Sequence, residues 1–351
     1  MPVSQDAEAQ LTQVQVTASV DAMGGDHGPD VVIRACGDAH RSMPHLRFLL
    51  HGDEQLIRPE LERCGLREAV ARVQHTDKRV LMDEKPGLAL RRGKGSSMWN
   101  AVDAVQQGEA DLVISAGNSG AFMVIARLLL GMRSGLDRPA LVSPIPSRTG
   151  FTTFLDLGAN IDCDANRLVE FAVMGDAFHR AAYTVENPRI GLLNVNTDPA
   201  KAGEVLKRAN EQLGNVALGL NYRGLIAASA ITSGEVDVVV TDGFTGNVAL
   251  KAMEGTVRMI GGSLRDALSR SPAAVMGALL AQRPLNRVKQ RFNRAPAALL
   301  VGLNRWAVKS HGAANVGDFT MALATATDMV TSNFGLELDR SLARLKPAAL
   351  H

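Results

Sequence analysis

The sequence predicts an α/β fold, in which a largely parallel sheet is covered by helices on both faces. Three observations predict it. Short apolar strands, turns rich in glycine and polar residues, and helices recur in that order along most of the 351-residue chain. Repeated units of this kind make parallel sheets with helices on both sides. Hydrophobic residues form 46% of the chain, enough for one large domain or two lobes.

The expected strands are β-branched or apolar runs that end at a glycine or a polar turn. They are 14–20, 46–50, 71–75, 111–115, 140–145, 152–157, 189–195, 236–240, 297–303 and 307–309. Pro144 and Pro146 should break the strand at 140–145, because proline cannot donate to a sheet ladder. The helices expected between these strands have helical apolar spacing or a capping residue. They are 31–42, 56–64, 98–107, 122–130, 167–183, 201–213, the run from 248, and a last helix from 319.

The domain prediction follows from changes in composition along the chain. Residues 1–12 are polar and should form a disordered tail. Residues 13–335 should form a single α/β catalytic domain, with an amphipathic helical insertion at about 256–294 that protrudes as a hairpin. Residues 336–351 should form a C-terminal tail.

Composition excludes several classes of protein. Aromatic residues are 4% of the chain and the net charge is +2, which argues against nucleic-acid binding. The three cysteines are scattered, so we expect no zinc site, no disulfide framework and a cytoplasmic location. The N-terminus has no apolar core of a signal peptide, and no apolar run reaches the roughly 18 residues of a membrane span. We expect neither a metal nor a cofactor.

Polar and glycine-rich turns follow several expected strands, where ligands of parallel sheets bind. The backbone N–H groups of such turns and the positive ends of helices hold anions. We therefore expect the turns to converge on one crevice for an anionic substrate. The predicted substrate-binding residues are Gly24, Gly25, Asp26, Arg91, Ser96, Ser97, Asn118, Ser119, Gly120, Asn160, Asn194, Gly243, Thr245, Gly246 and Asn247. Any single turn of this kind is equally consistent with plain architecture.

The segment 283–294 is basic, amphipathic and free of acidic residues. Such a segment can lie on an anionic membrane face. The expected membrane contacts are Leu279, Leu280, Leu285, Arg287, Val288, Lys289, Arg291 and Phe292. A helical hairpin packed at a subunit interface explains the pattern equally well, and the two can coexist.

Seven stretches, in the same order along the chain, resemble the PlsX family of acyl-acyl carrier protein:phosphate acyltransferases. They are 21–29, 96–98, 115–121, 155–160, 191–194, 236–251 and 310–312. The resemblance spans roughly 14–330. Two segments depart from the family pattern, 195–203 and 220–226, and we expect both to border the substrate site.

The resemblance implies transfer of a fatty acyl group from acyl carrier protein to inorganic phosphate. The acyl phosphate would pass to a membrane glycerol-3-phosphate acyltransferase. It also implies a fold similar to isocitrate and isopropylmalate dehydrogenases, a homodimer and peripheral membrane association. Phosphate would attack the thioester directly. The expected catalytic residues are His27, Asp242, Lys251 and His311, with Lys251 or Arg91 offsetting the phosphate charge and His27 or His311 protonating the thiolate.

Three other functions remain open on the sequence. A phosphotransacetylase-like enzyme that uses short-chain acyl-CoA is the nearest. A metal- and NAD-dependent decarboxylating dehydrogenase would need a carboxylate cluster, for which Asp156, Asp162 and Asp164 are the candidates. A membrane-surface scaffold built around 256–294 would have no use for so many polar turns.

Overall fold

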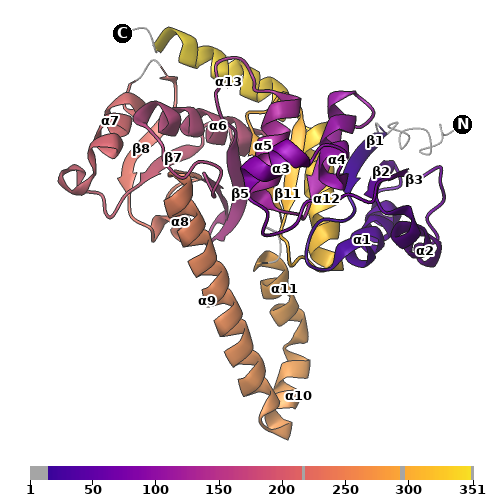
Figure 1. Cartoon of the computed structure of the whole chain (residues 1–351). Helices are drawn as coiled ribbons and strands as arrows, with labels where there is room; N and C mark the ends of the chain where they lie inside the picture. The colour runs from indigo at the N-terminus through magenta and orange to yellow at the C-terminus, as the bar shows by residue number, and fades with distance from the viewer. Residues whose placement is uncertain (1–14, 216–217, 293–296, 349–351) are drawn as a thin grey trace, which may run out of the picture. The chain divides into compact units, whose positions relative to one another are not determined.

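The computed structural model describes residues 15–215, 218–292 and 297–348, so the tail expected at 1–12 lies outside the described residues. The chain divides into two compact units (Figure 1). Unit 1 comprises Met1–Gly131 and Asn304–Thr331, and unit 2 comprises Met132–Leu303 and Ser332–His351. Each unit has its own set of strands.

Unit 1 contains five parallel strands in the order β3-β2-β1-β4-β11. They are β1 (Val16–Asp21), β2 (Leu46–Gly52), β3 (Ala71–His75), β4 (Leu112–Ser115) and β11 (Trp306–Ser310). Side chains of the central strands are buried, as expected for parallel strands covered on both faces. Because these strands are parallel, β1, β4 and β11 all end at the same edge.

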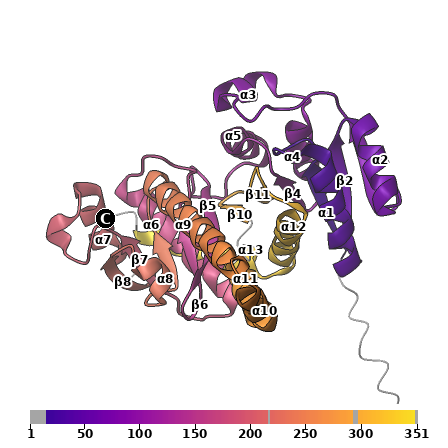
Figure 2. The same cartoon turned by 90° about the horizontal axis from the view of Figure 1, so that it is seen from below.

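Two groups of helices cover the strands of unit 1 (Figure 2). One consists of α1 (Gly28–Ser42), α2 (Glu54–Cys64) and α12 (Val316–Thr331), which pack together. The other consists of α3 (Pro86–Arg92), α4 (Ser97–Gln106) and α5 (Ser119–Leu130). Both α4 and α12 contact β1 and β4, and Figure 2 shows the two groups on opposite sides of these strands. The predicted α/β class is confirmed.

Unit 2 contains six strands in the order β10-β5-β6-β9-β7-β8. They are β5 (Ala140–Ser147), β6 (Gly150–Leu155), β7 (Arg189–Leu193), β8 (Asn221–Ile226), β9 (Val238–Val240) and β10 (Ala297–Val301). The β5 strand runs antiparallel to β10 and β6, and the other neighbours are parallel. The helices are α6 (Ala165–Tyr183), the one-turn η2 (Pro199–Lys201), α7 (Glu204–Leu213), α8 (Ala230–Ser233), α9 (Gly243–Ser269), α10 (Pro272–Leu280), α11 (Gln282–Phe292) and α13 (Phe334–Ala348).

Several boundaries differ from the sequence prediction, the strand β8 was not predicted, and two of the differences have a clear physical reason. The β5 strand continues through Pro144 and Pro146 to Ser147. Its pairing with β10 stops at Val142, so the missing proline N–H groups cost that ladder nothing. The helix expected from 248 begins at Gly243, because Asp242 caps it.

The C-terminal tail expected from 336 is largely helix α13 and belongs to unit 2. This helix packs on α6. The rings of Phe334 and Phe178 meet edge to face with centroids 5.5 Å apart, and Leu338 and Leu342 are buried. Burial of these apolar side chains is what makes the segment structured.

The expected helical insertion forms a hairpin from α9, α10 and α11. The long α9 and the shorter α11 run away from the strands of unit 2 and are joined by α10 (Figure 1). The hairpin exposes many large apolar side chains, among them Ile260, Met276 and Leu280. No helix in the described part of the chain is long and apolar enough to cross a membrane.

Candidate active site

The turns after β1, β4 and β11 of unit 1 are in mutual contact. The Asp26 N–H donates to the Gly312 carbonyl oxygen over 2.9 Å. A Cβ at Gly24 would lie 2.6 Å from the Gly117 nitrogen, so only glycine fits there. The predicted turns at Gly24–His27, Asn118–Gly120 and His311 are thereby brought together within this unit.

A buried polar cluster lies beneath these turns. The Asp21 carboxylate accepts a 2.7 Å hydrogen bond from the Ser115 hydroxyl, and Lys309 is only 7% exposed. Burial raises the pKa of Asp21, while hydrogen bonds from Ser115 and Ser97 and the charge of Lys309 oppose the rise. Among the described residues, neither Asp21 Oδ1 nor Ser310 Oγ has a hydrogen-bond partner.

Most of this cluster is absent from the residues predicted from the sequence. Asp21, Ser115 and Ser310 are the last residues of parallel strands and Lys309 is the last but one of β11, at the end where ligands of such sheets bind. A polar residue at the end of an apolar strand could have indicated the cluster, because burying a polar group costs free energy unless it is hydrogen-bonded.

Asn118 positions the start of α5. Its Oδ1 accepts from the Ala121 N–H over 3.0 Å and so caps the helix. Its Nδ2 donates to the carbonyl oxygens of Leu81, Met82 and Glu84 at 3.2, 3.0 and 2.7 Å. Among the described residues, no group accepts from the N–H of Ser119 or Gly120. These two donors, at the positive end of a helix, suit an oxyanion.

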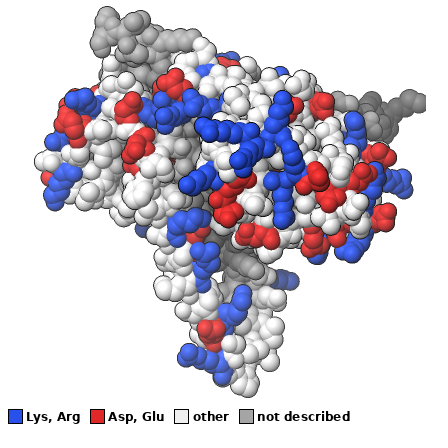
Figure 3. All heavy atoms as spheres, viewed as in Figure 1, with Lys and Arg blue, Asp and Glu red and all other residues white. Residues whose placement is uncertain are grey.

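The loop tied down by Asn118 leads into a basic surface. Segment 78–94 contains Lys78, Arg79, Lys85, Arg91, Arg92 and Lys94, all exposed, against the acidic Asp83 and Glu84. In the described structure, no carboxylate lies within ion-pair distance of these six side chains. Figure 3 shows Lys and Arg side chains gathered on the face that carries α3. We call residues 78–94 the basic segment.

The remaining predicted residues of unit 1 differ in exposure. His27 and His311 are exposed, and His311 Nδ1 accepts from the Ala313 N–H at 3.3 Å. Ser96 and Ser97 are buried, and the Ser96 hydroxyl caps α4 by accepting from the Trp99 N–H. The two serines therefore hold the start of α4 in place.

Asp156 organises the corresponding turns of unit 2. This fully buried carboxylate accepts four hydrogen bonds, from the N–H groups of Leu141, Ala159 and Asn160 and from Asn160 Nδ2, at 2.6–3.1 Å. Burial raises the pKa of Asp156, and these four donors oppose the rise. Asp156 thus holds the predicted turn residue Asn160 in place. In a metal-dependent dehydrogenase, this carboxylate would instead have been a metal ligand.

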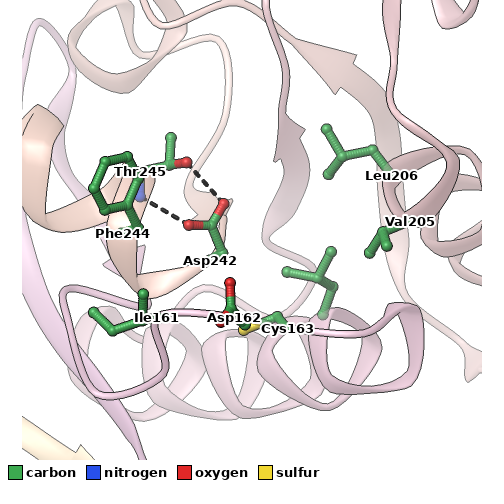
Figure 4. A pocket seen from close by; sticks show the side chains of 9 residues that line it. Ile161, Asp162, Cys163, Val205, Leu206, Asp242, Phe244 and Thr245 are labelled. Atoms are coloured by element: carbon green, nitrogen blue, oxygen red, sulfur yellow. Dashed lines mark hydrogen bonds between the residues drawn. The ribbon is translucent and has the colours of Figure 1, made fainter.

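Three N–H groups in the first turn of α9 donate hydrogen bonds to acceptors of the protein itself. Asp242 Oδ1 accepts from the Thr245 N–H at 2.8 Å, and Asp242 Oδ2 accepts from the Thr245 hydroxyl at 2.7 Å (Figure 4). The Gly243 N–H donates to the Asn160 carbonyl oxygen, and the Gly246 N–H donates to that of Asp242. A Cβ at Gly246 would overlap the Asp156 carbonyl oxygen, which explains the glycine. Asp242 therefore acts as a helix cap here.

Two further predicted residues lie apart from this turn. Lys251 is exposed and pairs with Glu254 at 3.0 Å, about 12 Å along α9 from Gly243 at 1.5 Å per residue. Asn194 is buried and donates to the Asn196 carbonyl oxygen at 2.9 Å. The expectation that the turns of both units border one crevice stays a prediction.

A family model described as fatty acid synthesis protein matches residues 16–336. The chain is 54% identical to a phosphate acyltransferase of Phenylobacterium zucineum, covering 97% of both chains. It is 47% identical to one of Caulobacter vibrioides, covering 94% of this chain and 92% of the relative. The chain belongs to the PlsX family of phosphate acyltransferases. The resemblance drawn from the sequence motifs is confirmed.

Among solved structures, a phosphotransacetylase of Streptococcus pyogenes is similar to this PlsX-family chain with a TM-score of 0.61. The match covers 91% of this chain and 94% of the other at 18% identity, so it concerns the fold alone. The family membership makes this protein an acyltransferase that acts with phosphate in fatty acid and phospholipid synthesis.

Proposed function

We propose that this protein transfers a fatty acyl group from acyl-acyl carrier protein to inorganic phosphate, and that the acyl phosphate serves glycerol-3-phosphate acylation. The observation that supports a carrier-protein donor is the basic segment. Its cations lie beside exposed apolar side chains, Leu81 at 51%, Met82 at 46% and Leu88 at 40%. A surface of unpaired cations around apolar side chains suits a small acidic protein.

We assign the phosphate to the start of α5. The N–H groups of Ser119 and Gly120 supply two donors there, and Arg91 of the basic segment adds positive charge within the same unit. The phosphate oxygen attacks the acyl carbon, the C–O bond forms and the C–S bond breaks. The departing thiolate takes a proton from His27 or His311, whose turns meet through the Asp26–Gly312 hydrogen bond. Asp242 and Lys251 have no step in this scheme.

The acyl donor can be tested directly by mass spectrometry of acyl phosphate formed from hexadecanoyl-acyl carrier protein and phosphate. We expect Lys85→Glu/Arg92→Glu to raise the KM for the carrier-protein donor about tenfold and to weaken its salt dependence, because steering charges are lost. The matched control is Arg67→Glu/Arg72→Glu, which changes the charge equally at exposed positions outside the basic segment. Equal KM values in both variants, or faster turnover of acetyl-CoA by the unmodified protein, would contradict the proposal.

The helical hairpin supports the proposed homodimer and membrane contact. Val257, Ile260 and Leu264 share one face of α9, and all are exposed. We assign this face to a second copy of the chain.

At the tip of the hairpin, Leu279 and Leu280 are 59% and 82% exposed, and Arg283 and Arg287 follow on α11. We assign the tip to an anionic membrane surface. The side chains of Lys289, Arg291 and Phe292, also expected to contact it, lie outside the described residues.

We expect Leu279→Glu/Leu280→Glu to lower binding to vesicles that contain anionic phospholipid by at least about tenfold. Each leucine is worth about 1.5–3 kcal/mol on full burial. Sedimentation with vesicles measures the bound fraction, and sedimentation velocity without lipid should show an unchanged dimer. Leu56→Glu, at a 50% exposed position on α2, is the control. Unchanged vesicle binding of the hairpin variant would remove the membrane assignment.

A further inference from the structure

Unit 2 contains a pocket of about 470 Å³ beside the first turn of α9 (Figure 4). Its walls come from the loop after β6, from α6 and from α7. The lining residues are Ile161, Asp162, Cys163, Leu168, Val205, Leu206, Asp242, Phe244 and Thr245. The volume falls within the roughly 300–1,000 Å³ of small-molecule sites.

The lining favours a neutral apolar ligand. Five of the nine lining residues are Ile, Leu, Val or Phe, and the two charged ones, Asp162 and Asp242, are both acidic. No Lys, Arg or His is among the described residues of the lining, so phosphate would meet only repulsion. Burial raises the pKa of the Cys163 thiol to about 12, so this side chain is also uncharged at neutral pH.

The first turn of α9, beside the pocket, offers a hydrogen-bond donor. Of the first four N–H groups of α9, those of Gly243, Thr245 and Gly246 already have acceptors. Within the described part of the chain, no acceptor faces the Phe244 N–H, and the Phe244 side chain lines the pocket. A carbonyl oxygen suits this donor, since it accepts a hydrogen bond without adding charge beside Asp242.

We propose that this pocket binds the acyl chain of the donor. The inference rests on the proposed function for the identity of the ligand. It assigns chain-length selectivity to Val205 and Leu206, which lie in the first turn of α7, just after the segment 195–203 that departs from the family pattern. Side-chain size at these two positions sets how much of the chain the pocket accepts.

The experiment compares Leu206→Trp with Lys207→Trp, which places the same side chain on an exposed position of α7 that does not line the pocket. Acyl phosphate formation is measured with octanoyl and hexadecanoyl donors on acyl carrier protein. We expect Leu206→Trp to lower kcat/KM for the hexadecanoyl donor at least tenfold and for the octanoyl donor less than twofold. Lys207→Trp should leave both values unchanged. Equal losses with both donors, or unchanged selectivity, would overturn the inference.

A second measurement separates the pocket from the proposed reaction. Decanamide, a neutral amide with a ten-carbon chain, should raise the melting temperature of the unmodified protein and of Lys207→Trp but not of Leu206→Trp. If the protein forms no acyl phosphate while this pattern holds, the proposed donor is wrong and the apolar pocket stands. If transfer occurs but decanamide stabilises all three proteins equally or none, the pocket assignment is wrong.

Discussion

Replacing Asn118 by aspartate is expected to lower acyl phosphate formation about a hundredfold. The new carboxylate keeps an oxygen that caps α5 through Ala121, but it loses the amide that donates to the carbonyl oxygens of Leu81, Met82 and Glu84. The basic segment is then released from α5, and a negative charge stands beside the Ser119 and Gly120 N–H groups. Misplacement of a binding group by about 1 Å can cost roughly a hundredfold in rate.

The measurement is the initial rate over a range of phosphate concentrations. We expect the KM for phosphate to rise together with the fall in kcat, because an anion now repels the substrate. The control is Asp53→Asn, which replaces a carboxylate by an amide at the N-cap of α2, the reverse of the change at Asn118. It should leave the rate unchanged. If Asn118→Asp keeps the wild-type dependence of rate on phosphate concentration, phosphate does not bind at the start of α5.

Replacing Asp156 by alanine is expected to lower the free energy of unfolding by about 3–5 kcal/mol, the usual cost of removing one partner from a buried charged network. Four donors from Leu141, Ala159 and Asn160 lose their acceptor in a fully buried site. Asp156→Asn keeps one acceptor oxygen and should lose about half as much, since its amide would face donors.

Equilibrium unfolding in urea measures both changes. The control is Asp162→Ala, an exposed carboxylate in the same loop, which should change the free energy by less than about 0.5 kcal/mol. Equal stability of Asp156→Ala and the Asp162→Ala control would show that the four hydrogen bonds contribute little, and that the loop is held by packing alone.

The local sequence pattern was sufficient to predict most strands of the sheet. The β-branched run before Asp242 was identified as a strand, and its burial on both faces is observed in Val238–Val240. The start of α9 was placed five residues too late, because glycines at 243 and 246 are typical of a loop. Their close packing against Asn160 and Asp156 is a tertiary contact that no local pattern encodes.

The candidate site was predictable in part. The turns at Gly24, Asn118 and His311 were identified by composition, and the parallel order of β1, β4 and β11 brings them together. The role of Asp242 was not predictable. An acidic residue before a helix looks alike in sequence whether or not it caps the helix, and the bond to Thr245 shows that Asp242 does. Its catalytic role stays a prediction.

The sequence by itself determined the α/β class, the family and the reaction class, since strand and helix periodicity and the ordered turn motifs are local properties of the chain. Tertiary structure alone decided which turns meet, which of their N–H groups remain available and where an apolar pocket opens. Those properties depend on residues far apart in sequence: Ser115 bonds to Asp21, and Asp242 and Val205 line one cavity. The physical reason is that burial and hydrogen-bond satisfaction are set by neighbours in space, while propensity is set by neighbours in the chain.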